Sequence, residues 1–223
     1  MVEAHAQSVE DYLIEGLSYK LSPGASYVTN RRSVSFFPSG SDTYSPSSGV
    51  KVIRIKVNGT DWLDPSSAKV QFDVTNNHAS NSIYFLSGGH AFFSRCRILC
   101  GSQVVEDIQS YNRVCEMFSI LQSQNKLDND GIEGARKWYD STTDFLTSTK
   151  KRTFSMKLCS GLLNQPKMLP VRYAPLEIEL ELVGDANEAV KTTNNDANWT
   201  ISNVQLKADV VTLDNALENS YAE

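Results

Sequence analysis

Few of the residues that build catalytic and metal sites occur in this sequence. Its 223 residues include three histidines, His5, His78 and His90, which stand far apart and form no His-x-His pair. A metal site of the cupin type would need two or three histidines and a carboxylate that converge inside a barrel. We therefore expect no metal ion, no cofactor and no catalytic residue, and we predict that the chain is not an enzyme.

Cysteine is also scarce, and the spacing of Cys96, Cys100, Cys115 and Cys159 contains no CxxC pair and no zinc-binding pattern. Because we also find no secretion signal, we expect free, buried thiols. Cys115 and His90 are the one combination that suggests a nucleophile and its base. Cys115, however, falls on the apolar face of a predicted helix, which favours a packing role.

Long apolar runs and a strong excess of basic charge are missing as well. No stretch approaches 18 consecutive apolar residues, so we expect no membrane span. The N-terminal residues carry acids and lack a basic region followed by an apolar segment, so we expect no secretory signal. Lys and Arg total 21 against 26 Asp and Glu, a net charge of -5, which argues against a strongly basic nucleic-acid binder.

The binding motifs that occur are incomplete. Residues 128–131 (DNDG) are similar to the centre of a calcium loop, but Lys126 and Lys137 stand where that loop needs oxygen ligands. The only run of three basic residues, 150–152, precedes a predicted strand, where charge commonly discourages pairing between sheet edges. We therefore expect no specific nucleic-acid motif.

Most of the chain shows the period-2 alternation of half-buried β-strands. The loops between the strands are marked by Asn-Gly, Asp-Pro and Ser/Pro/Gly clusters, including 38–49, 58–65 and 184–198. Gly101-Ser102 predicts a tight hairpin. The predicted strands are 33–37, 51–57, 68–75, 83–86, 95–100, 103–108, 154–158, 176–183 and 199–211.

Two of these strands carry further information. In 176–183 the leucines and isoleucine point inward, while Glu177, Glu179 and Glu181 form an outer face that is either solvated or docks on a basic face, containing Arg54 and Lys56, of a neighbouring copy. In the last strand the alternation slips at Ser202-Asn203, which predicts a β-bulge.

One segment has helical periodicity instead. After Ser110, a predicted N-cap, five apolar residues recur at spacings of three and four: Tyr111, Val114, Cys115, Phe118 and Leu121. We predict a helix at 110–122 that packs beside the sheets and shapes a contact between subunits, and a second short helix at 135–139. Exposure of Val114 and Phe118 in the isolated chain would support such a contact, and complete burial would exclude it.

About eight strands without an alternating strand–helix rhythm predict an all-β fold. The long polar connections favour an antiparallel eight-stranded jelly-roll sandwich with one or two helical insertions. We assign residues 1–30 to an N-terminal arm and 31–223 to a single jelly-roll domain with an insertion at about 109–150. The three tryptophans are anchors of either the core or an interface: Trp62, Trp138 and Trp199.

The order of several short motifs resembles the first jelly roll of hexon-like double jelly-roll major capsid proteins, in particular those of Polinton-type elements and adintovirus-like double-stranded DNA viruses. The likeness covers roughly residues 27–223. The motifs that carry it are 31–40 (RRSVSFFPSG), 44–46 (YSP), 62–65 (WLDP), 92–99 (FFSRCRIL), 101–108 (GSQVVEDI), 111–113 (YNR) and 204–213.

The resemblance implies a structural protein of the virion, located in the capsid and assembled inside the host cell. In that family, trimers of double jelly rolls form pseudo-hexameric capsomers that tile an icosahedral shell. The expected partners are therefore further copies of the protein, as a trimer when a second jelly roll is present, and other capsid proteins. This chain departs from the family because it contains one jelly roll. It is therefore the N-terminal piece of a longer protein, one of two halves that are separate chains, or a single-jelly-roll relative. The alternative is a lectin-like or cytokine-like jelly-roll binding module.

Overall fold

In a computed structural model, residues 28–123 and 145–222 are described. His5, Trp138, the acidic turn at 128–131 and the predicted helix at 135–139 lie outside these ranges. Residues 30–212 form one compact unit, and helix α4 (Asn215–Ala222) belongs to a separate unit. The description below concerns the unit of residues 30–212.

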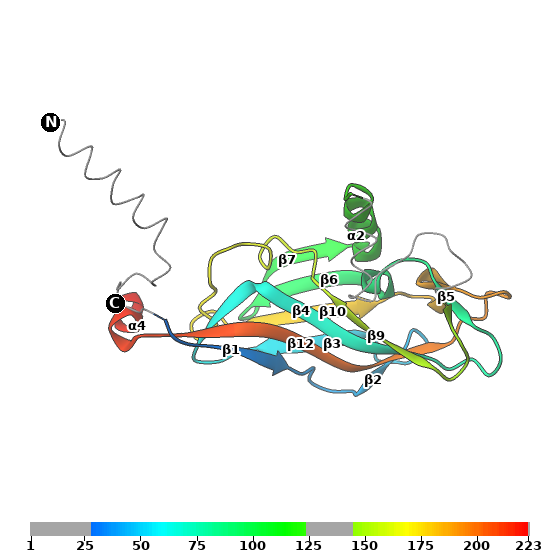
Figure 1. Ribbon diagram of the computed structural model, residues 1–223, viewed down its shortest axis with the longest axis horizontal. Coiled ribbons are helices and arrows are strands. Elements are labelled where there is room, and N and C mark those ends of the chain that lie inside the picture. Colours follow the sequence, from blue (N-terminus) through cyan, green and yellow to red (C-terminus); the bar gives the residue numbers. More distant parts are fainter. Residues whose placement is uncertain (1–27, 124–144, 223) are drawn as a thin grey trace, which may run out of the picture. The chain divides into compact units, whose positions relative to one another are not determined.

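Two sheets form the body of this unit (Figure 1). The first, which we call sheet A, has the strand order β1-β12-β4-β9, and the short β2 pairs with β12. Sheet B has the order β3-β10-β6-β7, with antiparallel pairing throughout. The strands of sheet A are β1 (Val28–Phe36), β2 (Thr43–Tyr44), β4 (Trp62–Asn76), β9 (Lys151–Met156) and β12 (Trp199–Leu213). The strands of sheet B are β3 (Val52–Val57), β6 (Phe93–Cys100), β7 (Gln103–Gln109) and β10 (Leu176–Leu182).

Smaller elements are attached to the two sheets. Three short strands form a third sheet with the order β11-β5-β8. They are β5 (Ile83–Phe85), β8 (Phe145–Leu146) and β11 (Val190–Lys191). The helical elements are η1 (Gly89–Phe92), α2 (Tyr111–Ile120) and η3 (Ala186–Glu188).

The connections between the long strands identify the fold. Leaving aside the short strands β2, β5, β8 and β11, successive strands alternate between sheet A and sheet B at every step except the β6–β7 hairpin. Wrapping a chain around two facing sheets in this way produces a jelly roll. The predicted all-β, antiparallel jelly-roll sandwich is therefore confirmed.

The inward residues of both sheets form one continuous core. The predicted inward set is buried on β3 (Ile53, Ile55, Val57), on β4 (Val70, Phe72, Val74) and on β10 (Leu176, Ile178, Leu180). At one end of the core the aromatic rings pack together: Phe72 lies 5.6 Å from Phe154, and Phe92 lies 4.9 Å from Trp199, between ring centroids. Gly89 lies against this cluster, because a Cβ there would stand 3.2 Å from the Phe72 ring.

The predicted bulge is confirmed. The pairing of β12 with β4 changes register between Ser202 and Gln205, and Asn203 has a positive φ of 51°. The irregularity lets Ile201 and Val204 both point into the core, although they are three residues apart.

The predicted strand boundaries differ most at the starts of β1 and β4. The strand expected at 33–37 begins at Val28, because Arg31 bonds Asp209 of β12 and Asp64 of β4, and Arg32 bonds Asp61. Residues 62–65, expected in a loop, belong to β4. Pro65 is tolerated there because it falls where the register between β4 and β12 shifts, so no regular ladder bond is required of it.

The polar loops were also more structured than expected. The segment 38–49 contains β2, and 184–198 contains η3 and β11. Both segments bury apolar side chains against the sandwich, including Tyr44, Ala189 and Val190.

Tyr44 is 1% exposed, and among the described residues its hydroxyl has no hydrogen-bond partner. A buried hydroxyl without a partner destabilises the folded state. We expect Tyr44→Phe to leave the free energy of unfolding unchanged or to raise it by up to about 1–2 kcal/mol, measured by urea denaturation.

The matched control is Tyr111→Phe. The Tyr111 hydroxyl accepts a hydrogen bond from the backbone N–H of Cys159 at 2.8 Å, so its removal should lower the free energy of unfolding by about 1 kcal/mol. Equal losses in the two variants would show that the Tyr44 hydroxyl is hydrogen-bonded after all, for example to a buried water.

Candidate interaction surfaces

The histidines of the described residues, His78 and His90, are half-buried and hydrogen-bonded. Nε2 of His90 lies 3.0 Å from Ser87 Oγ and 3.2 Å from a carboxylate oxygen of Glu116, and Ser87 also donates to that carboxylate. A catalytic relay needs its two partners on opposite ring nitrogens, whereas both partners here share one nitrogen. Nδ1 of His78 accepts from two backbone N–H groups, and its Nε2 lies 3.1 Å from Asp196. His90 thus connects η1 to α2, and His78 orders the loop that follows β4.

Cys115 is placed in the core, not beside a base. It is 8% exposed on the inner face of α2, and burial raises the pKa of its thiol to about 12. Among the described residues, the His90 ring bonds Ser87 and Glu116 and makes no hydrogen bond with Cys115. All four cysteines are free, as predicted, but Cys100 and Cys159 are half-buried where we expected burial. In the described residues no cluster of histidine, cysteine and carboxylate side chains could hold a metal ion.

The acidic and basic residues of sheet B share one outer face, whereas the predicted docking between copies assumed two separate faces. Because β10 lies between β3 and β6, its glutamates stand next to basic residues of the same chain. The carboxylate of Glu179 bonds Arg54 at 2.7 Å and also pairs with Arg97. Glu179 is 7% exposed, so it is buried between the two guanidinium groups instead of being solvated. This face is covered by its own ion pairs, including Arg95 with Asp107.

Helix α2 is present at the predicted place, although its N-cap differs. Ser110 adopts a left-handed conformation with a φ of 51°, and its side chain makes no capping bond. Tyr111 and Cys115 are buried against the sandwich, whereas Val114 is half-buried and Phe118 is 50% exposed. Further exposed apolar side chains at the same end are Met117, Ile120 and Leu121. Val114 and Phe118 are thus not completely buried within the chain. This is the outcome that we expected if α2 contributes to a contact between subunits.

The basic run at 150–152 and the two tryptophans of the described residues lie on strands of sheet A or next to them. Residues 150–152 lie at the start of the edge strand β9, where Lys151 bonds Asp73 and the Arg152 guanidinium lies 5.0 Å from the Phe85 ring centre. Trp199 is buried in the core, and its indole N–H donates to the carbonyl of Ala186. Trp62 is half-buried on β4.

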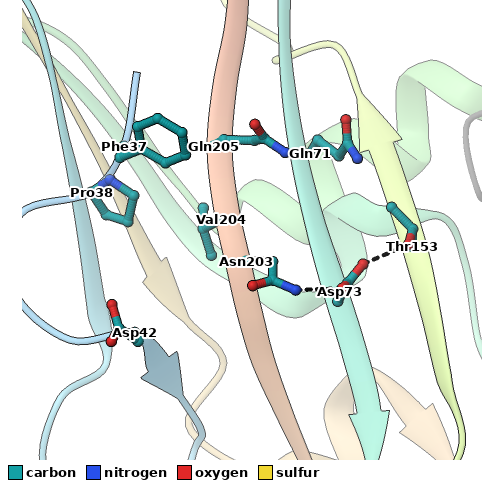
Figure 2. A pocket seen from close by; sticks show the side chains of 9 residues that line it. All are labelled: Phe37, Pro38, Asp42, Gln71, Asp73, Thr153, Asn203, Val204 and Gln205. Carbon is teal, nitrogen blue, oxygen red and sulfur yellow. Dashed lines mark hydrogen bonds between the residues drawn. The ribbon is translucent and has the colours of Figure 1, made fainter. Parts of the chain in front are cut away.

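A groove crosses the outer face of sheet A and was not predicted. We call it the outer groove. Its volume is about 570 Å³. Figure 2 shows the segment after β1 on one side of it, the strands β12 and β4 beneath it, and Thr153 of β9 beyond them. Its lining consists of Phe37, Pro38, Asp42, Gln71, Asp73, Thr153, Asn203, Val204 and Gln205.

Asp73 is the most strongly bonded side chain of the outer groove. Its carboxylate accepts hydrogen bonds from Thr153 and from Asn203, the residue at the bulge (Figure 2), and from Lys151. Burial alone raises the pKa of Asp73, but these three hydrogen bonds outweigh it and lower the pKa below its ordinary value. Sequence alone offered one signal, an acidic residue in the middle of a strand, where Asp is uncommon.

Of the comparisons with known proteins, only the one with solved structures finds matches to this chain. No family model matches the chain, and no curated protein matches it. A model of the PBCV-1 virus capsid matches with a TM-score of 0.56 and 14% identity, over 92% of this chain and 47% of that one. PBCV-1 VP54, fitted into a reconstruction of the virophage Sputnik, matches with a TM-score of 0.58 and 13% identity, over 92% and 47%.

A third structure, of the Sputnik virophage by cryo-EM, matches with a TM-score of 0.57 and 9% identity, over 89% of this chain and 51% of that one. This chain has the fold of these capsid structures. It spans about half of their length. Within the described residues, no helix has the length and apolar character needed to cross a membrane.

Proposed function

We propose that this chain is a structural subunit of a viral capsid and has no catalytic role. The observation that carries the proposal is the jelly-roll topology, shared over nine-tenths of the chain with structures of virus capsids. Fold alone does not define function, so the surface must also suit assembly. The apolar end of α2 meets that condition, because a shell subunit needs contact surfaces that remain exposed in the isolated chain.

A more specific proposal, the type of capsid protein, rests on the sequence resemblance together with the length of the matched structures. Those chains are about twice as long as the part that matches here. We propose that residues 31–223 are equivalent to the first jelly roll of a hexon-like major capsid protein, preceded by an arm at 1–30. Paired with a second jelly roll, it would form trimeric, pseudo-hexameric capsomers of an icosahedral shell and contact other capsid proteins.

The charge of the chain agrees with a shell around double-stranded DNA. A coat that neutralises its own genome needs many basic residues, because the negative charge of the phosphates is neutralised by Lys and Arg. This chain has a net charge of -5. A location in the virion, after assembly in the host cell, follows from the same proposal.

The test of the subunit contact is Phe118→Asp. We expect the purified chain to self-associate, and the variant to raise the concentration for half-dissociation at least about tenfold, because a charge would be buried in an apolar contact. Sedimentation velocity measures the association, and electron microscopy of the same material shows whether trimers or shells form.

The control is Tyr173→Asp, because Tyr173 is 49% exposed and Phe118 is 50% exposed. Neither change should lower the free energy of unfolding by more than about 0.5–1 kcal/mol, since both side chains are half in solvent. A chain that stays monomeric at every concentration, or equal weakening by both variants, would contradict the proposed contact.

A further inference from the structure

The outer groove contains polar side chains that the fold leaves without partners. Gln71 of β4 and Gln205 of β12 stand directly opposite each other in the pairing of the two strands. Both are half-buried, and among the described residues neither amide makes a hydrogen bond. The exposed carboxylate of Asp42 also makes none. Each amide offers two donors and an acceptor oxygen, so the groove presents both kinds of hydrogen-bonding group in a confined space.

An exposed aromatic ring stands at the same groove. Phe37 follows β1, and its side chain is 68% exposed. Pro38 is beside it and is fixed by bridging to Ile55 of β3. Exposure of a Phe ring costs free energy in water, and a ligand with an apolar face would recover part of that cost by covering the ring.

The charge of the lining restricts the ligand further. Two carboxylates, Asp42 and Asp73, line the outer groove, and its described lining contains no lysine, arginine or histidine. Lys151, next to the lining, is paired with Asp73, so the unpaired charge of the groove is that of Asp42. An anionic ligand would be repelled, and the carboxylates favour a ligand that donates hydrogen bonds. The carboxylate of Asp73 is already occupied by its three donors, which leaves Asp42 and the two amides for recognition.

We propose that the outer groove binds a neutral oligosaccharide. Such a ligand combines hydroxyl groups, which both donate and accept, with C–H faces that pack on an aromatic ring. In this arrangement Phe37 lies under one face of a sugar ring, while Gln71, Gln205 and Asp42 bond its hydroxyl groups. The volume of about 570 Å³ lies within the range of small-molecule sites.

A protein partner suits the outer groove less well. The buried centre of a protein interface is more apolar than the remaining surface and poor in charge, whereas this lining is mostly amide, hydroxyl and carboxylate with one exposed aromatic ring. The sugar site is independent of the capsid proposal, because it concerns the isolated chain and a face of sheet A that does not include α2.

The experiment applies the purified 223-residue chain to an array of neutral, sialylated and sulfated glycans. The strongest neutral glycan is then titrated as the free sugar and followed by ligand-observed NMR. We expect neutral glycans to bind and the anionic ones to bind more weakly. Phe37→Ala and the double variant Gln71→Ala/Gln205→Ala should each weaken binding at least about tenfold. The first removes the ring that packs on the sugar, and the second removes the two amides that bond its hydroxyl groups.

The matched control is Gln103→Ala, which removes an exposed amide from sheet B and should leave binding unchanged. All these positions are exposed or half-buried, and thermal melting confirms that each variant is folded. Absence of binding, preference for anionic glycans, or full binding by the groove variants would overturn the proposal. So would a change of oligomeric state in Phe37→Ala, because the groove would then be a contact between subunits.

Discussion

Replacing Phe92 with alanine is expected to lower the free energy of unfolding by about 3–5 kcal/mol, the largest loss we anticipate for a single side chain. Phe92 is fully buried, and its ring contacts other aromatic rings: Phe72 at 6.0 Å, Phe85 at 6.1 Å, Phe154 at 5.6 Å and Trp199 at 4.9 Å. These rings come from three strands of sheet A, namely β4, β9 and β12, and from β5, so a cavity at this point weakens several elements together. Urea denaturation followed by tryptophan fluorescence measures the loss.

Phe37→Ala is the control for this experiment, because it removes the same side chain from a position that is 68% exposed. We expect it to change the free energy of unfolding by no more than about 0.5 kcal/mol. A loss below about 1 kcal/mol in Phe92→Ala would mean that the core collapses readily around the missing ring, in conflict with a close-packed aromatic cluster.

Much of the fold could be predicted because it depends on local alternation. In β3, β4 and β10 the inward residues are apolar at every second position, and a strand with one buried face requires this pattern. Even the bulge in β12 was visible, since Ile201 and Val204 cannot both be inward in a regular strand. The helix α2 was identified by the same logic with a period of 3.6.

The parts that could not be predicted depend on which strands are neighbours. The burial of Glu179 results from Arg54 on one side and Arg97 on the other, and single-strand alternation gives no information about strand order. The early start of β1 has the same cause, because Arg31 finds its partners on β12 and β4. The outer groove is a third case, since it needs the segment after β1 to lie beside β12.

Asp73 provides the second large effect. Asp73→Ala is expected to lower the free energy of unfolding by about 2–3 kcal/mol at neutral pH, because it removes a buried carboxylate that accepts from Thr153, Asn203 and Lys151. The bond to Asn203 also holds the bulge of β12, whose left-handed backbone is unfavourable by itself. Denaturation in urea at a series of pH values measures the difference between the variant and the original chain.

The pH dependence gives a further check on the same residue. The pKa of Asp73 is lowered in the folded state, so its ionised form stabilises the fold. This contribution is fully present above the ordinary carboxyl pKa of 3.8, and it is lost as the pH falls through the lower pKa of the folded state. The stability difference between the original chain and Asp73→Ala should therefore be constant near neutral pH and shrink below about pH 4.

Asp42→Ala is the control, because Asp42 lines the same groove but is exposed and makes no hydrogen bond with the described residues. We expect it to change the free energy of unfolding by no more than about 0.5 kcal/mol at any pH. If the loss in Asp73→Ala stayed constant down to strongly acidic pH, the ionised carboxylate would not be the source of the stabilisation. The three side chains around Asp73 would then contribute through packing and not through hydrogen bonds to a charge.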